Sequence, residues 1–262
     1  MFISQPVGQN APNDRADVVL IQSLLNLNLP RIPNAPFLTE DGALGPHSQA
    51  LIAEFQSSIA TPGSASGVIE PDSPTLVALR SVVTGIVDTN VLRIIMPLST
   101  AELAAKYFQP LMAAMNTNQI NTPLRQAHFL AQLGHESASM VYTSEIASGK
   151  AYEGRHDLGN TQPGDGPLFK GRGLIQITGR NNYTAYGKAR SRDFITGANP
   201  QLLATDPDIA ADSAGWFWAT RNLNKLADQD NALAITKKIN GGTNGLSDRE
   251  LRLNICKCLL IP

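Results

Sequence analysis

The sequence contains little of what marks several common classes of protein. Only two of its 262 residues are cysteines, Cys256 and Cys258, a spacing that usually cannot close a disulfide and is too sparse for a structural zinc site. Two thiols favour synthesis in a reducing cytoplasm. Apolar residues make up 42% of the chain and charged residues 16%, which is typical of a globular protein and excludes a disordered or fibrous one.

The first fifteen residues contain no basic leader, no long apolar core and no small-residue cleavage site, so we expect no secretory signal there. No segment is long and apolar enough to predict a membrane span, and membrane insertion is not expected. The net charge is -1, and residues 1–95 carry four Lys/Arg against eight Asp/Glu. So small a net charge does not predict binding to nucleic acid, although the mildly basic rest of the chain is compatible with binding an anionic polymer.

The length of the chain and the positions of its turn-forming residues predict two domains and a mainly α fold. Residues 1–85 contain three short segments with helical spacing of apolar residues, separated by turn signals such as Asp41-Gly42 and Gly45-Pro46. Residues 86–98 are apolar and β-branched and are interpreted as a linker. Residues 99–262 are predicted to form a larger α-rich domain with a minor β element, which begins where Thr100 caps a helix.

The front segment resembles the bacterial peptidoglycan-binding module of three small helices. The family pattern is a helix ending LQ-x-x-LN, followed by DG-x-x-GP-x-(S/T)-x-x-A-(L/V)-x-x-FQ, and residues 15–80 cover it. The matching residues are Gln22, Leu25, Asn26, Asp41, Gly42, Gly45, Pro46, Ser48, Ala50, Leu51, Phe55 and Gln56. The resemblance implies wall binding around Asp41, Gly42, Gly45 and Pro46. Each of these residues also suits a tight turn, so binding is inferred from the whole pattern.

A predicted helix over residues 124–139 carries the sequence Gly-His-Glu-Ser, in which Glu136 is the carboxylate. A zinc-protease signature would need a second His three residues after the Glu, but position 139 is Ser. His128 and His135 share a helical face and could form a metal pair. Such histidines more often pack and hydrogen-bond, so we predict no metal and no cofactor.

A glycosidase needs two carboxylates, one protonated to donate to the leaving oxygen and one ionised to activate water or attack the sugar. Glu136 and Glu145 are the candidates. On one continuous helix they would lie on opposite faces, roughly 13 Å apart along the axis, so the helix is predicted to end between them. Glu153 in the following loop is the rival for the base, with Arg155 able to pair with it.

Residues 171–179 alternate between apolar and polar, which predicts a strand. Ile175 and Ile177 would lie on the packed face, and Gln176 and Thr178 on the other. The glycines of this segment do not have the spacing of a nucleotide-binding loop. A helix follows that contains Trp216 and Trp218, which we interpret as core residues.

Taken in order, the Gly-His-Glu-Ser helix, this strand, the Trp-rich helix and an Ile-Asn-Gly loop resemble glycoside hydrolase family 19, the chitinase-type family, and particularly its phage-endolysin branch. The resemblance spans about residues 100–260 and implies a lysozyme-like α-rich fold, with Glu136 as general acid and Glu145 as base. It further implies substrate contacts or support of the acidic site by Gln176, Thr178, Tyr183, Asn240 and Arg249.

The predicted function is a muramidase-like peptidoglycan hydrolase, an endolysin that cleaves β-1,4 bonds with inversion. Its partner would be peptidoglycan glycan strands, and it would act as a monomer after release through a holin or another export route. A chitinase acting on GlcNAc polymer and a non-catalytic wall-binding protein are the alternatives. The front module favours peptidoglycan, because tethering an enzyme to its own polymer raises the local substrate concentration. For the chemistry, apolar surroundings would favour a protonated Glu136 and polar surroundings an ionised Glu145.

Overall fold

Three helices and a two-stranded ladder form the front module in the computed structural model, which describes residues 2–262. The elements are β1 (Val7–Gly8), α1 (Arg15–Asn28), α2 (Pro46–Phe55), β2 (Val68–Ile69) and α3 (Pro74–Arg80). A 3-10 turn (Leu29–Arg31) follows α1, and a π-helical turn (Gln56–Ala60) follows α2. The three helices lie where the sequence predicts them. The ladder was not predicted, because strands of two residues are too short to show an alternating pattern.

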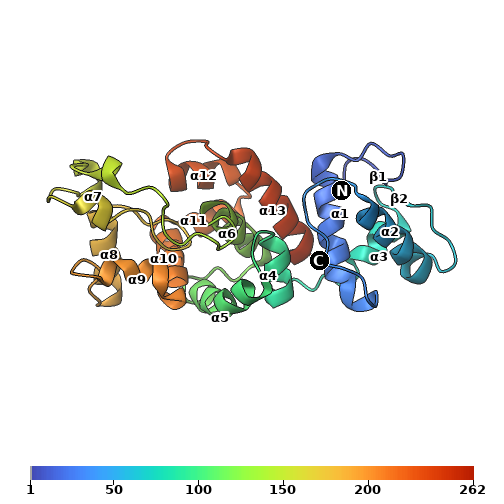
Figure 1. Cartoon of the computed structure of the whole chain (residues 1–262), viewed down its shortest axis with the longest axis horizontal. Coiled ribbons are helices and arrows are strands. Elements are labelled where there is room, and N and C mark those ends of the chain that lie inside the picture. Colours follow the sequence, from blue (N-terminus) through green and yellow to red (C-terminus); the bar gives the residue numbers. More distant parts are fainter. Residues whose placement is uncertain (1) are drawn as a thin grey trace.

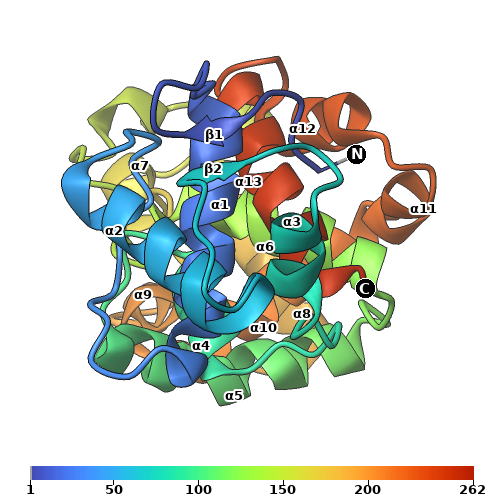
Figure 2. The same ribbon diagram turned by 90° about the vertical axis from the view of Figure 1, so that its right-hand side faces the viewer.

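Helix α1 lies between the rest of the module and the larger domain. It begins where the Asp14 side chain accepts from the N–H of Ala16, at 2.9 Å. The Asn28 amide donates to the Leu79 carbonyl at 2.8 Å and so ties the end of α1 to α3. Figure 2 looks onto the module and shows α2, α3 and the ladder in front of α1.

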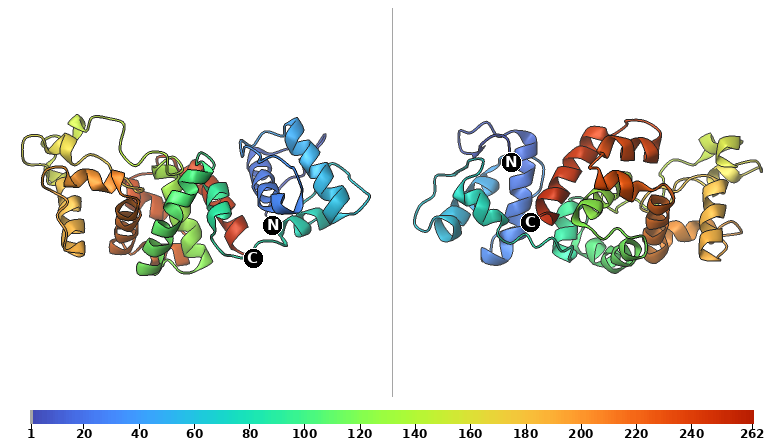
Figure 3. Two further views of the ribbon diagram at one scale, coloured as in Figure 1. Left: turned by 60° about the horizontal axis from the view of Figure 1, so that its bottom comes forward. Right: turned by 180° about the vertical axis from the view of Figure 1, so that it is seen from behind.

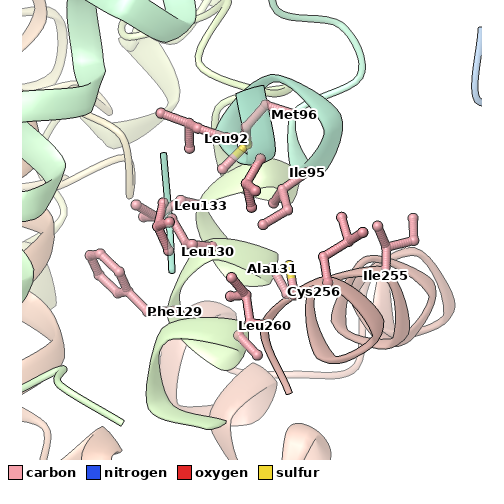
Figure 4. Close-up of a cluster of buried hydrophobic side chains, with 14 of the residues drawn as sticks. Leu92, Ile95, Met96, Phe129, Leu130, Ala131, Leu133, Ile255, Cys256 and Leu260 are labelled. Carbon is pink, nitrogen blue, oxygen red and sulfur yellow. The ribbon is translucent and has the colours of Figure 1, made fainter. Parts of the chain in front are cut away.

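Residues 86–98, expected to be a linker, contain helix α4 (Thr89–Ile95). The Asp88 side chain caps it by accepting from the N–H of Val91 at 2.7 Å. Leu92, Ile95 and the following Met96 are buried against α6 and the end of the chain (Figure 4). The segment joins the two domains as a packed helix because its apolar residues fit the core of the larger domain.

The larger domain is mainly helical, with isolated β-bridges between Ser144 and Arg172 and between Arg172 and Ile177, and it extends away from the module (Figure 1). Its helices are α5 (Ala101–Thr117), α6 (Pro123–Glu136), α7 (Asp165–Leu168), α8 (Arg180–Arg190), α9 (Leu202–Thr205), α10 (Pro207–Thr220), α11 (Leu223–Asp228), α12 (Ala232–Asn240) and α13 (Leu246–Leu260). Three 3-10 turns (Lys150–Tyr152, His156–Leu158 and Asn199–Gln201) lie between them. The predicted mainly α fold is confirmed. Among residues 2–262, none of the helices combines the length and the apolar character that a bilayer crossing requires.

The core of this domain forms where α13 packs along α6 and α10 packs along α5. The rings of Phe129 and Trp218 meet edge to face, with centroids 5.3 Å apart. Trp216 and Trp218 are both buried, which confirms their interpretation as core residues. Cys256 and Cys258 are free and buried, and burial raises the pKa of Cys256 to about 12 and that of Cys258 to about 11.

The module contacts the larger domain through α1, which packs against α4 and α13. Arg80 donates to the carbonyl of Ile261 at 2.8 Å, so the last residues of the chain lie against the module. Arg93 of α4 lies over the Phe37 ring, 3.9 Å from its centroid. Figure 3 shows the same arrangement from two more sides, with the module at one end and α7 and α8 at the other.

Candidate active site

Glu136 is the last residue of α6, and the chain reverses directly after it. Ala138, Ser139 and Met140 all have left-handed backbones, with φ of 46°, 60° and 69°. The N–H of Ser139 donates to Gly134 O, and the N–H of Met140 to the Ser137 hydroxyl, both at 2.8 Å. The helix therefore ends between the two candidate carboxylates, as predicted, although earlier than residue 139.

This left-handed turn is strained, since each L residue in that region costs about 1–2 kcal/mol. Ser137, Ser139 and Met140 are buried, and their packing and hydrogen bonds hold the turn in place. Strained backbone of this kind is concentrated at functional sites. Its effect here is to leave Glu136 partly exposed at the helix end and to send the chain toward Glu145.

Arg249 of α13 contacts Glu136 directly. Its Nη2 lies 2.5 Å from Glu136 Oε1, and Nη1 donates to the side-chain oxygen of Gln132. The Arg249 side chain is 2% exposed and that of Glu136 is 16% exposed. The surroundings of Glu136 are therefore not apolar, because the packing of α13 along α6 brings a buried cation to its carboxylate.

The two histidines of α6 bind different partners. His128 is fully buried, with Nε2 2.8 Å from Asp230, and burial lowers its pKa. His135 lies beside Glu136, with Nδ1 2.7 Å from Asp248. Within residues 2–262 no three His, Cys, Asp or Glu side chains are arranged to hold a metal ion. Each histidine instead joins α6 to a later segment of the chain.

Glu145 is partly exposed and is bonded to Tyr152, Lys170 and Gly171, which follow it in the chain. Its N–H donates to Gly171 O at 2.9 Å, while its Oε2 accepts from the N–H of Gly171 and its Oε1 from the Tyr152 hydroxyl, both at 3.1 Å. Lys170 Nζ donates to the Glu145 carbonyl at 2.7 Å. Burial raises the pKa of Tyr152, and the charge of Glu145 adds to the rise, so Tyr152 stays a donor. These polar surroundings suit an ionised Glu145.

Gln176 and Thr178 converge on the same place. A Cβ built on Gly171 would lie 2.9 Å from Gln176 Oε1 and 3.4 Å from both Glu145 Oε2 and Thr178 Oγ1. The two side chains are partly exposed, and the Thr178 hydroxyl donates to the Gln176 carbonyl at 2.9 Å. Gly171 was not among the predicted site residues. Its place in the Gly-Arg-Gly pattern is the signal that identifies it.

The predicted strand over residues 171–179 is instead a tight loop. Arg172 and Ile177 exchange two backbone hydrogen bonds, of 3.1 and 2.7 Å, across a turn in which Gly173 and Gln176 are left-handed. These two residues break the extended backbone, so the strand prediction is wrong. The predicted division into a packed side and a polar side is confirmed, because Ile175 and Ile177 are buried while Gln176 and Thr178 are partly exposed.

Tyr183 is fully buried behind this loop. Its hydroxyl donates to Lys170 O at 2.8 Å and accepts from Arg172 Nη1 at 3.1 Å, and burial raises its pKa to about 12. Its ring packs on Phe169. The structure thus places Tyr183 as a support of the loop that carries Gln176 and Thr178, away from any open surface.

Asn240 is exposed at the end of α12 and shapes the following loop. Its side chain donates to Asn244 O and accepts from the N–H of Gly242, both at 2.8 Å. The loop returns to the site at Gly245, where an added Cβ would lie 2.2 Å from the His135 ring. The structure therefore brings this loop against the helix end that carries Glu136.

Glu153, the alternative candidate for the base, binds backbone groups of a loop. Its two oxygens accept from the N–H groups of Gly164 and Gly166, at 2.6 and 2.8 Å, and close the loop between them. Arg155 pairs with Asp157 rather than with Glu153. Glu145 is the carboxylate that lies with the polar side chains around Gly171, so the geometry favours it as the base.

Three of the four predicted wall-binding residues line one pocket of the module. It has a volume of about 200 Å³, and its walls include Asp41, Gly45 and Pro46. Asp41 accepts from the Gln22 amide and from the N–H of Ala43, both at 2.9 Å. Gly42 is not among the residues that line the pocket; it has φ of 75°, and a Cβ there would meet the Arg15 carbonyl at 2.8 Å.

Comparison with known proteins decides the family. The family model for glycoside hydrolase family 19, described as chitinase class I, matches residues 103–240. A glycosyl hydrolase family 19 domain-containing protein of Haemophilus influenzae is 30% identical over 173 residues, which cover 54% of this chain and 83% of that protein. The chain belongs to glycoside hydrolase family 19. This family 19 chain is thus an O-glycosyl hydrolase, so the alternative of a non-catalytic wall-binding protein is set aside.

Other relatives of the family 19 enzyme match over shorter stretches or by fold. Endochitinase At2g43620 of Arabidopsis thaliana is 41% identical over 116 residues, which are 44% of this chain and 38% of that protein. The chain therefore spans well under half of that plant relative. Chitinase C from Streptomyces griseus HUT6037 has a similar fold, with a TM-score of 0.56 and 22% identity over 66% of this chain and 92% of that one.

Proposed function

We propose that this family 19 enzyme is an endolysin that hydrolyses the β-1,4 glycan backbone of peptidoglycan. The observation that carries the proposal is the front module, whose pattern resembles peptidoglycan-binding modules and whose pocket brings Asp41, Gly45 and Pro46 together. A module packed on a glycosidase keeps the enzyme on its own polymer and so raises the effective substrate concentration. In this proposal the protein acts as a monomer and reaches the wall through a holin or another export route.

In the proposed reaction Glu136 is the general acid and Glu145 the general base. Glu145 accepts from Tyr152 and Gly171 and, in its ionised form, takes a proton from the attacking water. The water attacks the anomeric carbon directly, so the configuration inverts and no covalent intermediate forms. Gln176 and Thr178, which converge with Glu145 at Gly171, would hold the water or the sugar.

Arg249 gives the reaction an additional step. An ionised Glu136 paired with Arg249 cannot donate a proton. Glu136 must take up a proton and loosen this pair before it protonates the leaving oxygen. Because Arg249 is buried and also bonded to Gln132, the carboxyl group is the partner that moves.

Chitin is the second candidate substrate. The relatives of this chain include proteins named endochitinases, and chitin has the same β-1,4 link between uncharged GlcNAc units. The choice between the polymers rests on the module and on the surroundings of the site.

The test compares release of reducing ends from purified peptidoglycan and from colloidal chitin, with Glu136→Gln as the inactive control. We expect the wild-type enzyme to clear peptidoglycan faster than it degrades chitin. Degradation of chitin alone would overturn the proposed substrate. Wall clearing by Glu136→Gln at the wild-type rate would overturn the proposed mechanism.

A further inference from the structure

Arg221 is a partly buried cation directly after α10. Its guanidinium stacks on the Phe217 ring, 3.4 Å from the centroid. Its side-chain hydrogen bonds are two long ones of 3.4 Å, to Thr220 Oγ1 and to Asn182 Oδ1. A guanidinium has five N–H donors, so Arg221 retains donors for another partner.

Most arginines of the larger domain form an ion pair with a carboxylate, but Arg221 does not. Those that pair are Arg125, Arg155, Arg180, Arg190, Arg249 and Arg252. Within residues 2–262 no carboxylate lies within 4 Å of the Arg221 side chain. Burial lowers the pKa of Arg221, which shows that its surroundings disfavour the charge. A cation in such a place is stabilised when an anion binds to it.

Arg221 lies one side chain away from the candidate active site. Asn182, which accepts from Arg221, donates through its Nδ2 to the Thr178 carbonyl at 2.8 Å. Thr178 in turn converges with Glu145 at Gly171. A glycan that extends from Gln176 and Thr178 past Asn182 would reach the Arg221 guanidinium.

We infer that Arg221 binds a carboxylate of the substrate and so selects an anionic glycan over an uncharged one. The inference rests on the proposed function and names the part of peptidoglycan that this site recognises. Chitin carries no carboxylate. Peptidoglycan offers two sources, the lactyl group of N-acetylmuramic acid in strands free of peptide, and the acidic residues of the stem peptides.

The test measures kcat and KM of the full-length enzyme on three substrates: intact peptidoglycan, glycan strands stripped of peptide by an amidase, and the chitin hexasaccharide. Arg221→Gln removes the charge, and Arg221→Lys keeps it. Arg192→Gln is the matched control. Arg192 also lies by a phenylalanine, Phe194, and also has no carboxylate partner among residues 2–262, but no hydrogen bond links its side chain to Thr178.

We expect Arg221→Gln to lower the ratio of kcat/KM on the anionic substrate to that on the hexasaccharide by about ten-fold, through KM, because charge-assisted hydrogen bonds contribute at this scale. Arg221→Lys should restore much of the ratio, and Arg192→Gln should leave it unchanged. A loss confined to stripped strands assigns the lactyl carboxylate, and a loss confined to intact wall assigns the peptide.

An equal loss on all three substrates, or no loss, would overturn the inference while leaving the proposed function intact. A wild-type enzyme that cuts neither form of peptidoglycan would overturn both.

Discussion

Gly171→Ala tests how the candidate site is assembled around one backbone position. The new Cβ would lie 2.9 Å from Gln176 Oε1 and 3.4 Å from Glu145 Oε2 and Thr178 Oγ1. A contact below 3.0 Å forces a shift, and the tip of Gln176 is the atom that moves. The backbone of Gly171 is not left-handed, so alanine adds no backbone strain.

The expected effect is on activity rather than on folding. Extra atoms in a packed site cost about 1–3 kcal/mol, and a flexible side-chain tip places this variant at the low end. Displacing reacting groups by about 1 Å costs on the order of 100-fold in rate, and the contact at Gly171 displaces the Gln176 tip by about half that distance. We therefore expect kcat/KM on the hydrolysed glycan to fall by about 10-fold, while the melting temperature falls by a few degrees at most.

Gly242→Ala is the matched control. Its backbone is also not left-handed, and no atom outside its neighbours lies within 4 Å of the added Cβ, so we expect wild-type kcat/KM and stability. Wild-type activity in Gly171→Ala would refute the convergence of Gln176, Thr178 and Glu145 on this position. Unfolding of Gly171→Ala at room temperature would refute the view that a side-chain tip absorbs the contact.

Two further predictions concern the segments that hold Glu136. Ala138 has φ of 46°, so Ala138→Gly should relieve backbone strain, and this gain should exceed the cost of the greater entropy of the unfolded chain. In a denaturant titration the free energy of unfolding should rise by about 0.5–1 kcal/mol. A free energy of unfolding below that of the wild type would contradict the strain. Hydrogen bonding to His135 lowers the pKa of Asp248 to about 2 from 3.8, so its stabilising contribution is present above pH 4 and is lost as the pH falls toward 2. Asp248→Asn should flatten this part of the stability profile, and an unchanged profile would show that the pair contributes nothing.

The helices of the site region were predictable because their signals are local. Periodic apolar residues identify α5, α6 and α10, and the capping residue Thr100 marks the start of α5. The buried Trp218 follows from the same pattern. The buried α4 was hidden in an apolar run whose composition suits a linker, a strand or a helix. Its packing on α1, α5, α6 and α13 decides among them.

The chemistry around the carboxylates depends on contacts that local patterns do not carry. Arg249 reaches Glu136 across 113 residues of sequence, and Gly171 reaches Glu145 across 26. The left-handed turn after Glu136 contains no glycine, so nothing local marks it, and the left-handed Gln176 hides a tight turn within an alternating pattern. The order of the motifs in the sequence therefore identified the candidate site residues, and tertiary packing determined which groups they contact.

The most direct test of the account is the rate at which reducing ends are released from purified peptidoglycan by Glu136→Gln, Glu145→Gln and Glu153→Gln. The account predicts losses of about 100-fold or more for the first two, because each removes a proton-transfer group. The melting temperature should stay near that of the wild type for Glu145→Gln and fall for Glu136→Gln, which leaves the buried Arg249 without its carboxylate. Glu153→Gln should keep most of the activity, since Glu153 closes a loop. Wild-type release by Glu136→Gln, or an inactive Glu153→Gln beside an active Glu145→Gln, would contradict the account.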